Sequence, residues 1–271
     1  MIQECVTDGE KLCWLIEHSL LANAKWEALK SCLQYTGHQL ELTDFFHQLT
    51  IVNLAGRLII GGTSLAKQIE INDPRFQVEL KSFLRDNIEI PHDRINETYR
   101  FILRAVKAAQ ESIPDNLRRR FRSWAKSHHA HCYMCGVSLD FDKTADSHNS
   151  FTCEHIWPRA YGGNSIEDNL LPACQSCNSD KKGNFATWAM PAIQSLIMGF
   201  SPTTQRLQEI EGCYKFALHY RAVQRLAKRK DLTLKQAFLK FGPWTDVRVT
   251  RLDEVADFFN LENNQSLSEL L

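Results

Sequence analysis

The chain has 271 residues, an apolar fraction of 44% and equal numbers of basic and acidic side chains, 32 of each. This composition is typical of a globular protein with one large domain or two to three small ones. No apolar run approaches the ~20 residues of a membrane-spanning helix, and the N-terminus lacks the pattern of a secretory signal. We therefore expect a cytoplasmic protein without a membrane partner, whose nine cysteines are reduced or bind metal.

The neutral total hides an uneven distribution of charge along the chain. Residues 1–97 carry nine Lys/Arg and fourteen Asp/Glu, a net charge of −5. Residues 214–251 carry ten and two, a net charge of +8, and residues 252–271 carry five acids and no base. Because local charge decides whether a phosphate backbone is attracted, the zero net charge does not exclude a nucleic-acid partner.

Residues 1–112 are predicted to form an N-terminal helical domain. Apolar residues recur at steps of three and four between Leu12 and Leu33, which indicates a first helix that ends at Gly37. Thr43 is expected to cap a second helix over 44–60, which Gly61-Gly62 would end. Two more helices are expected, one opened by Pro74 and one over 93–112.

Residues 113–190 are predicted to form a small core of mixed structure. A basic helix after Pro114 comes first, with Arg118, Arg119, Arg120, Arg122 and Lys126. The segments FTCEHIW (151–157) and NLLPA (169–173) then indicate strands, and QSCNSDKKGN (175–184) indicates the start of a helix.

Helical periodicity returns in the basic C-terminal region, residues 191–271. Helices are expected from Tyr214, over 233–241 and over 252–260. The predicted fold class is thus mainly α, with a small α+β core between two helical arms.

Two C-x-x-C pairs lie in the middle region: Cys132 with Cys135, and Cys174 with Cys177. Each pair can place two thiolates on one ion through a tight turn, and four thiolates give the closed tetrahedral geometry of structural Zn²⁺. The alternative, four unrelated buried thiols, does not explain the paired spacing. Cys153 is expected to pack on the same strand face as His155.

Polar residues follow in a fixed order between and after these pairs: Glu154-His155, Asn169 and Asn178. The segments CYMC, CEHIWPRAYGGN, DNLLPAC and QSCNSDKKGN resemble, in this order, the HNH endonucleases, also called the ββα-metal family. The resemblance covers about residues 128–185. It implies a ββα-metal nuclease module in which the Cys₄ site holds the fold together.

The resemblance also implies a role for each polar residue. His155 would be the general base, and Glu154 and Asn178 would hold a catalytic Mg²⁺ or Mn²⁺ through oxygen atoms. Asn169 would fix the loop between the strands and help to orient the histidine. Contacts with the substrate phosphate are expected from Lys181, and also from Lys182 and Arg159. Glu154 stands where the family more often has Asp or His, and its longer side chain would shift the ion slightly.

The implied activity is metal-dependent hydrolysis of DNA, which we expect to be double-stranded. One base and one ion would nick a single strand per event, whereas the oligomeric state and target sequence stay open. A stand-alone HNH module with helical arms is similar to nucleases of bacterial anti-phage systems, including that of type II Zorya. In such a system the N-terminal arm would dock a protein partner.

Two other functions are compatible with the same residues. The first is a zinc-stapled module that binds nucleic acid or protein without catalysis, with Glu154 merely paired to Arg159 and Asn178 a helix cap. The second is an RNase with the same site.

Overall fold

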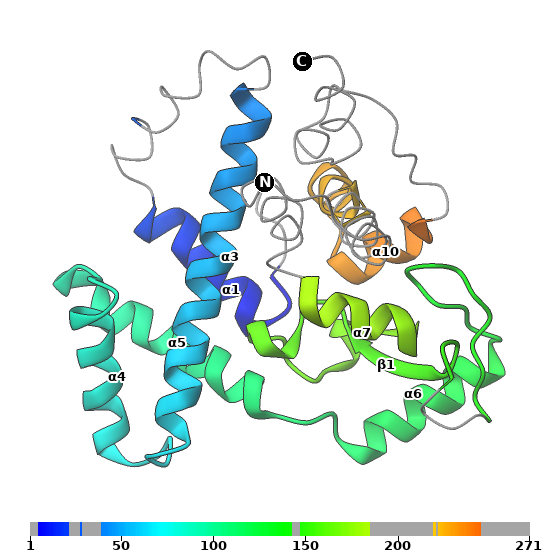
Figure 1. Ribbon diagram of the computed structural model, residues 1–271, viewed down its shortest axis with the longest axis horizontal. Coiled ribbons are helices and arrows are strands. Elements are labelled where there is room, and N and C mark those ends of the chain that lie inside the picture. The colour runs from blue at the N-terminus through cyan, green and yellow to red at the C-terminus, as the bar shows by residue number, and fades with distance from the viewer. Residues whose placement is uncertain are drawn as a thin grey trace, which may run out of the picture.

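In the computed structural model, residues 5–21, 28, 39–142, 147–184, 219–220 and 222–244 are described, without the side chains of 39–46 and 180–184. The N-terminal arm contains α1 (Asp8–Leu15) with a π-helical turn (Ile16–Leu20), α3 (Gln39–Ala66), α4 (Pro74–Asp86) and α5 (Ile95–Gln110). The core contains α6 (Asp115–Ser127), β1 (Phe151–His155), β2 (Leu170–Cys174) and α7 (Gln175–Asn184). The helical residues 222–230 and α10 (Leu234–Phe241) follow. The predicted fold class, helical arms around a small α+β core, is confirmed (Figure 1).

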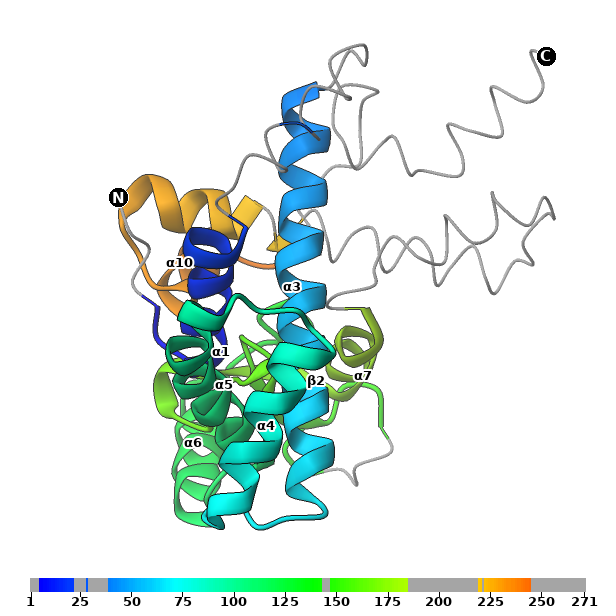
Figure 2. The same cartoon turned by 90° about the vertical axis from the view of Figure 1, so that its left-hand side faces the viewer.

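Helix α3 is the longest helix of the described chain, and it corrects the predicted second helix. Its 28 residues include Thr43, Gly61 and Gly62, so Thr43 is not its cap and the glycines do not end it. A Cβ atom on Gly61 would lie 2.4 Å from Cζ of Phe83, and one on Gly62 would lie 2.5 Å from Cγ2 of Val106. The glycines are therefore explained by the close approach of α4 and α5, which lie beside α3 in Figure 2.

One stretch of α3, His47–Ala66, is long and apolar enough to cross a membrane by length and composition alone. The sequence alone predicted no such run. One side of this stretch packs into the core of the arm through Ile51, Ala55, Leu58 and Ile59, against residues of α4 and α5 such as Phe76, Leu80 and Ile102. A core helix of a globular arm meets the same criterion, and the burial of this side is explained by that role.

Helices α4 and α5 begin close to their predicted positions, whereas α1 ends at Leu15 and its π-helical turn at Leu20, before the predicted end at Gly37. Asp73 caps α4 and Pro74 occupies its first turn, as expected for proline. Thr7 and Glu10 form a capping box at the start of α1. The expected helix end at Gly37 and the helix over 252–260 lie outside the described residues.

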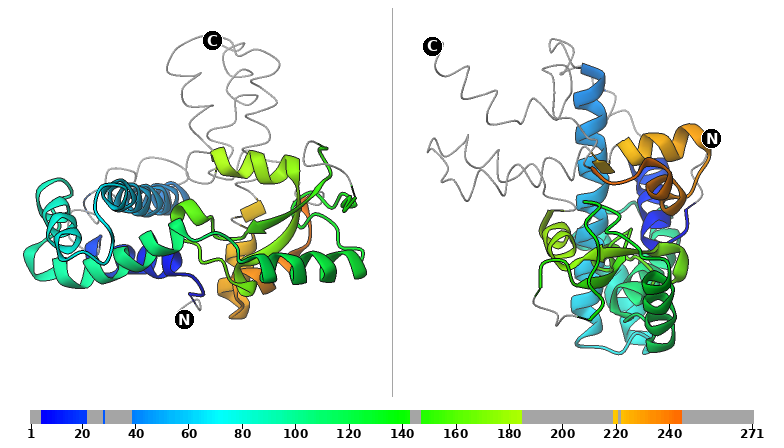
Figure 3. Two further views of the ribbon diagram at one scale, coloured as in Figure 1. Left: turned by 90° about the horizontal axis from the view of Figure 1, so that it is seen from below. Right: turned by 90° about the vertical axis from the view of Figure 1, so that its right-hand side faces the viewer.

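The two strands form an antiparallel hairpin, in which Glu154 pairs with Leu171 and His155 with Leu170. Helix α7 lies on one side of the hairpin and α6 on the other (Figure 1 and Figure 3, left). On the α6 side, Leu170 packs with Ile113 and Phe121.

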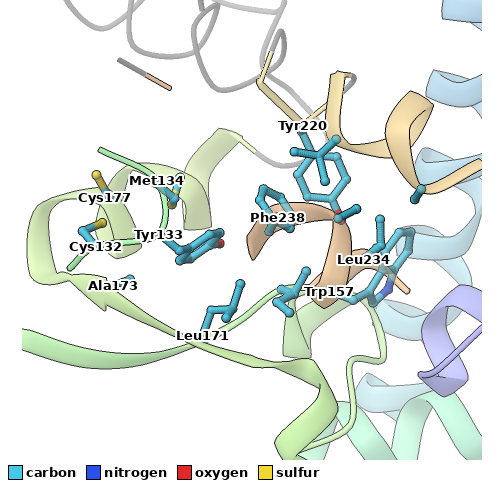
Figure 4. Close-up of a cluster of buried hydrophobic side chains, with 14 of the residues drawn as sticks. Cys132, Tyr133, Met134, Trp157, Leu171, Ala173, Cys177, Tyr220, Leu234 and Phe238 are labelled. Carbon is cyan, nitrogen blue, oxygen red and sulfur yellow. The ribbon is translucent and has the colours of Figure 1, made fainter. Parts of the chain in front are cut away.

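The largest cluster of the core joins residues that are far apart in sequence. Leu171 and Ala173 of β2 pack with Tyr133 and Trp157, and with Tyr220, Leu234 and Phe238 of the C-terminal region (Figure 4). The C-terminal helices therefore share one apolar cluster with the hairpin, while the domain boundaries at 112 and 190 stay predictions.

Candidate active site

The first C-x-x-C pair forms a tight turn that is held to the sheet. The N–H of Gly136 donates to the carbonyl of Cys132 at 2.8 Å, and the N–H of Cys132 donates to Val137 at 2.9 Å. Gly136 has φ +73°, in the left-handed region that favours glycine. The N–H of Tyr133 donates to the carbonyl of Pro172 at 3.0 Å, which fastens this turn to β2.

The second pair lies where β2 passes into α7, and it completes a four-cysteine cluster. The four sulfur atoms lie within 4.8 Å of one another, and three of the four cysteines are buried. Sγ of Cys135 lies 3.8 Å from Sγ of Cys174. Tetrahedral zinc with bonds of ~2.3 Å separates its sulfur ligands by about 3.8 Å, so the spacing fits. Hydrogen bonds from Cys135 and the other two thiols hold the pKa of Cys132 far below its usual value.

Glu154 and His155 are neighbours in β1, and strand alternation directs their side chains to opposite faces of the hairpin. His155 shares its face with Phe151 and Cys153, which pack in the cluster under α6. Burial raises the pKa of the Cys153 thiol to about 11, so this cysteine stays protonated at neutral pH. Its position agrees with the predicted packing role.

Glu154 therefore lies on the face opposite α6, which is the side of α7, and its residue is only 7% exposed. Burial raises the pKa of the Tyr133 hydroxyl well above its usual value, and the charges of Glu154 and Cys177 add to this effect. Tyr133 is thus close to both the carboxylate and the start of α7.

Asn178 follows Cys177 in the first turn of α7 and is 9% exposed. Its side-chain oxygen Oδ1 is buried and accepts no hydrogen bond from any residue that the structure describes. A buried amide oxygen without a donor costs roughly 1–3 kcal/mol of stability, and a hard cation would satisfy it. The buried carboxylate of Glu154 and this oxygen, both on the α7 side, therefore fit the donor set of Mg²⁺ or Mn²⁺.

Asn169 closes the loop between the strands with its side chain and its backbone. Its Oδ1 accepts from the N–H of Trp157 at 2.8 Å, and its Nδ2 donates to the carbonyls of Trp157 and Asn164, each at 3.0 Å. The N–H of Ile156 donates to the backbone carbonyl of Asn169 at 2.9 Å. This is the geometry that the predicted loop-fixing role requires, and the chain segment that it holds directly follows His155.

The three predicted phosphate contacts are placed differently. Arg159 is exposed, and its Nη1 lies 3.4 Å from the carbonyl of Glu111, the residue after α5. Lys181 and Lys182 belong to α7, but their side chains lie outside the described part of the structure. All three assignments stay predictions.

Sequence reasoning missed the loop that carries the partner of His155. Nε2 of His155 lies 3.0 Å from Oγ of Ser165, which in turn lies 3.4 Å from the carbonyl of Glu111. A Cβ atom on Gly163 would lie 1.9 Å from the carbonyl oxygen of Trp157, so only glycine fits there. The Gly162-Gly163 pair was the available signal, since adjacent glycines mark close backbone approach.

The start of α1 in the N-terminal arm is hydrogen-bonded to the same loop. The N–H of Gly9 donates to the carbonyl of Gly162 at 2.8 Å, and that of Asp8 donates to Oδ1 of Asn164 at 2.7 Å. Nδ2 of Asn164 donates back to Asp8 Oδ2 at 3.0 Å. The arm therefore contacts the candidate site directly.

A two-stranded hairpin followed by a helix, held by a four-cysteine cluster and bearing Glu154, His155 and Asn178, defines a ββα-metal module. The family model described as HNH endonuclease matches residues 132–188. This segment is thus an HNH endonuclease domain, as the resemblance indicated. Neither the comparison with curated proteins nor that with solved structures finds a match for the chain.

Proposed function

We propose that the protein is a metal-dependent endonuclease that nicks one strand of double-stranded DNA. The observation that carries the proposal is the buried oxygen of Asn178, which has no donor among the described residues and lies on the same side of the hairpin as the buried Glu154. A module that only bound nucleic acid would have no use for the buried Asn178 oxygen, because this oxygen costs stability unless a donor or a cation satisfies it.

Each residue would have a separate task in the reaction. Glu154 and Asn178 would hold Mg²⁺ or Mn²⁺, which neutralises the phosphate and the leaving oxygen when bound. His155 would accept the proton of the attacking water. Lys181, Lys182 and Arg159 would hold the substrate phosphates, and the Cys₄ cluster would bind structural Zn²⁺.

The basic side chains of helix α6 are evidence for the proposal of a nucleic-acid substrate. It covers the face of β1 that carries His155, and its five basic side chains are all exposed. The charges of Arg118 and Arg122 act on Cys153, two residues from His155. Trp124, 42% exposed, adds an aromatic surface to the same helix.

The test compares nicking of supercoiled plasmid by the wild type and by His155→Ala in Mg²⁺ and in Mn²⁺. We expect His155→Ala to lower the rate by a factor of about 10²–10⁴, the usual effect of removing a general base. His92→Ala is the control, because His92 is exposed on the arm. Equal rates for wild type and His155→Ala would refute the role of the base.

Two further results would decide between the alternatives. Absence of cleavage with every divalent ion, together with retained DNA binding, would favour a binding module. Faster cleavage of RNA than of DNA of the same sequence would favour an RNase.

A role in anti-phage defence, such as in a type II Zorya system with a protein partner on the arm, is part of the proposal. Loss of phage protection in cells that carry His155→Ala would support that role.

A further inference from the structure

We infer that Ser165 is a positioning residue for His155, and that it ties the general base to the end of α5 in the N-terminal arm. The inference rests on the proposed role of His155. The observation is a chain of two contacts, from Nε2 of His155 to Oγ of Ser165 (3.0 Å) and from there to the carbonyl of Glu111 (3.4 Å).

The chemistry of the three groups decides which atom donates in each of the two contacts. A carbonyl oxygen can only accept, so the single hydroxyl proton of Ser165 goes to Glu111. Oγ then accepts a hydrogen bond from Nε2–H of His155. A neutral imidazole has one N–H and one lone pair, so this arrangement selects the tautomer in which Nδ1 takes the proton of the attacking water.

The position of Ser165 is fixed from several sides. The residue is only 7% exposed, so water does not compete freely for its hydroxyl. It directly follows Asn164, which Asp8 and Asn169 both bind. The carbonyl of Glu111 also accepts from Arg159, at 3.4 Å. The general base is therefore oriented by a loop that the arm holds at two places, α1 and the end of α5.

The test uses the full-length protein with Ser165→Ala, Ser165→Thr and the control Thr152→Val. Thr152 lies on the other face of β1, where its hydroxyl donates to the carbonyl of Ala173 at 3.0 Å. We expect Ser165→Ala to lower kcat about tenfold with little change in KM, because one hydrogen bond is lost. Ser165→Thr keeps the hydroxyl and should retain most of the activity, and Thr152→Val should match the wild type.

A spectroscopic measurement separates positioning from folding. Nitrogen chemical shifts of the His155 ring report which nitrogen carries the proton, independently of turnover. We expect the Nε2–H tautomer in the wild type and in Ser165→Thr, and a mixture in Ser165→Ala, with unchanged zinc content. An unaltered tautomer in Ser165→Ala, or a kcat within twofold of the wild type, would overturn the inference. A wild type without nuclease activity would instead overturn the proposed function, while the tautomer would still test the contact.

Discussion

The side chain of Asn169 binds both backbone polar groups of Trp157, accepting from its N–H at 2.8 Å and donating to its carbonyl at 3.0 Å. Trp157 is the second residue after the proposed base, and Asn169 precedes the first residue of β2. The amide of Asn169 thus connects the two ends of the loop. It needs an acceptor for the N–H of Trp157 and a donor for its carbonyl. No carboxylate can supply the donor.

Asn169→Asp should therefore destabilise the protein. The variant places a carboxylate against the carbonyls of Trp157 and Asn164, and we expect a loss of about 1–3 kcal/mol in the free energy of unfolding. Urea denaturation measures this loss. Asn53→Asp is a matched control, since Nδ2 of Asn53 makes one exposed hydrogen bond to Leu49 in α3. Equal denaturation midpoints for the two variants would contradict the assigned role of Asn169.

The four-cysteine cluster gives a second prediction. Cys174→Ser should lose bound zinc and unfold the core, because metal binding contributes directly to folding. Cys153→Ser should keep its zinc, since Cys153 packs under α6 and is not part of the cluster. Metal analysis and circular dichroism measure the two effects. A well-folded Cys174→Ser protein that retains a full equivalent of zinc would show that the cluster is not the zinc site.

The sequence contained enough information for the hairpin and the cysteine cluster, because both depend on local patterns. Short apolar segments predicted β1 and β2, and the C-x-x-C spacing predicted the cluster that the structure brings together. The segment QSCNSDKKGN predicted the start of a helix, and α7 begins at its first residue, Gln175.

The contacts between the arm and the site could not be predicted, because they join residues far apart in the chain. Ser165 and Glu111 are ordinary residues in the sequence, and only the fold places the hydroxyl between His155 and the carbonyl. Gly61 was misread for a similar reason. A glycine that ends a helix and a glycine that admits Phe83 look alike in sequence. Whether Glu154 and His155 act on one phosphate stays a prediction.

The pair formed by Asp8 and Asn164 gives a third prediction, on the docking of the arm. Asn164→Asp replaces the donor to Asp8 Oδ2 by a second carboxylate, so two negative charges would face each other across 3.0 Å. We expect a loss of about 1–2 kcal/mol in the free energy of unfolding at neutral pH, and slower nicking.

A second substitution, at Asp8, should restore the stability that Asn164→Asp loses. Adding Asp8→Asn restores one donor and one carboxylate, with their positions exchanged. In the wild type the backbone N–H of Asp8 donates to Oδ1 of Asn164, and the double variant keeps this N–H. The double variant should recover both stability and nicking. Failure of the double variant to recover either would indicate that this pair does not control docking of the arm.

The exposed arginines of α6 give the last prediction. Arg120 pairs with Glu167 and Lys126 with Asp142, each at 2.8 Å. Among the described residues, no ion pair is formed by Arg118 or Arg119, so their charges are available to phosphates. Arg118→Ala and Arg119→Ala should each weaken DNA binding. Each should also lower the slope of log affinity against log salt by about 1, as expected when one phosphate contact is lost.

The control for this prediction lies on the arm, where Arg85 is exposed and pairs with its neighbour Asp86 at 2.7 Å. Arg85→Ala removes the same charge at a distance from the hairpin, so the salt slope should stay at its wild-type value. Equal slopes for Arg85→Ala and the α6 variants would place the nucleic-acid contact elsewhere. A lower slope only for the α6 variants would instead mark the side of the hairpin that carries His155 as the side facing the phosphate backbone.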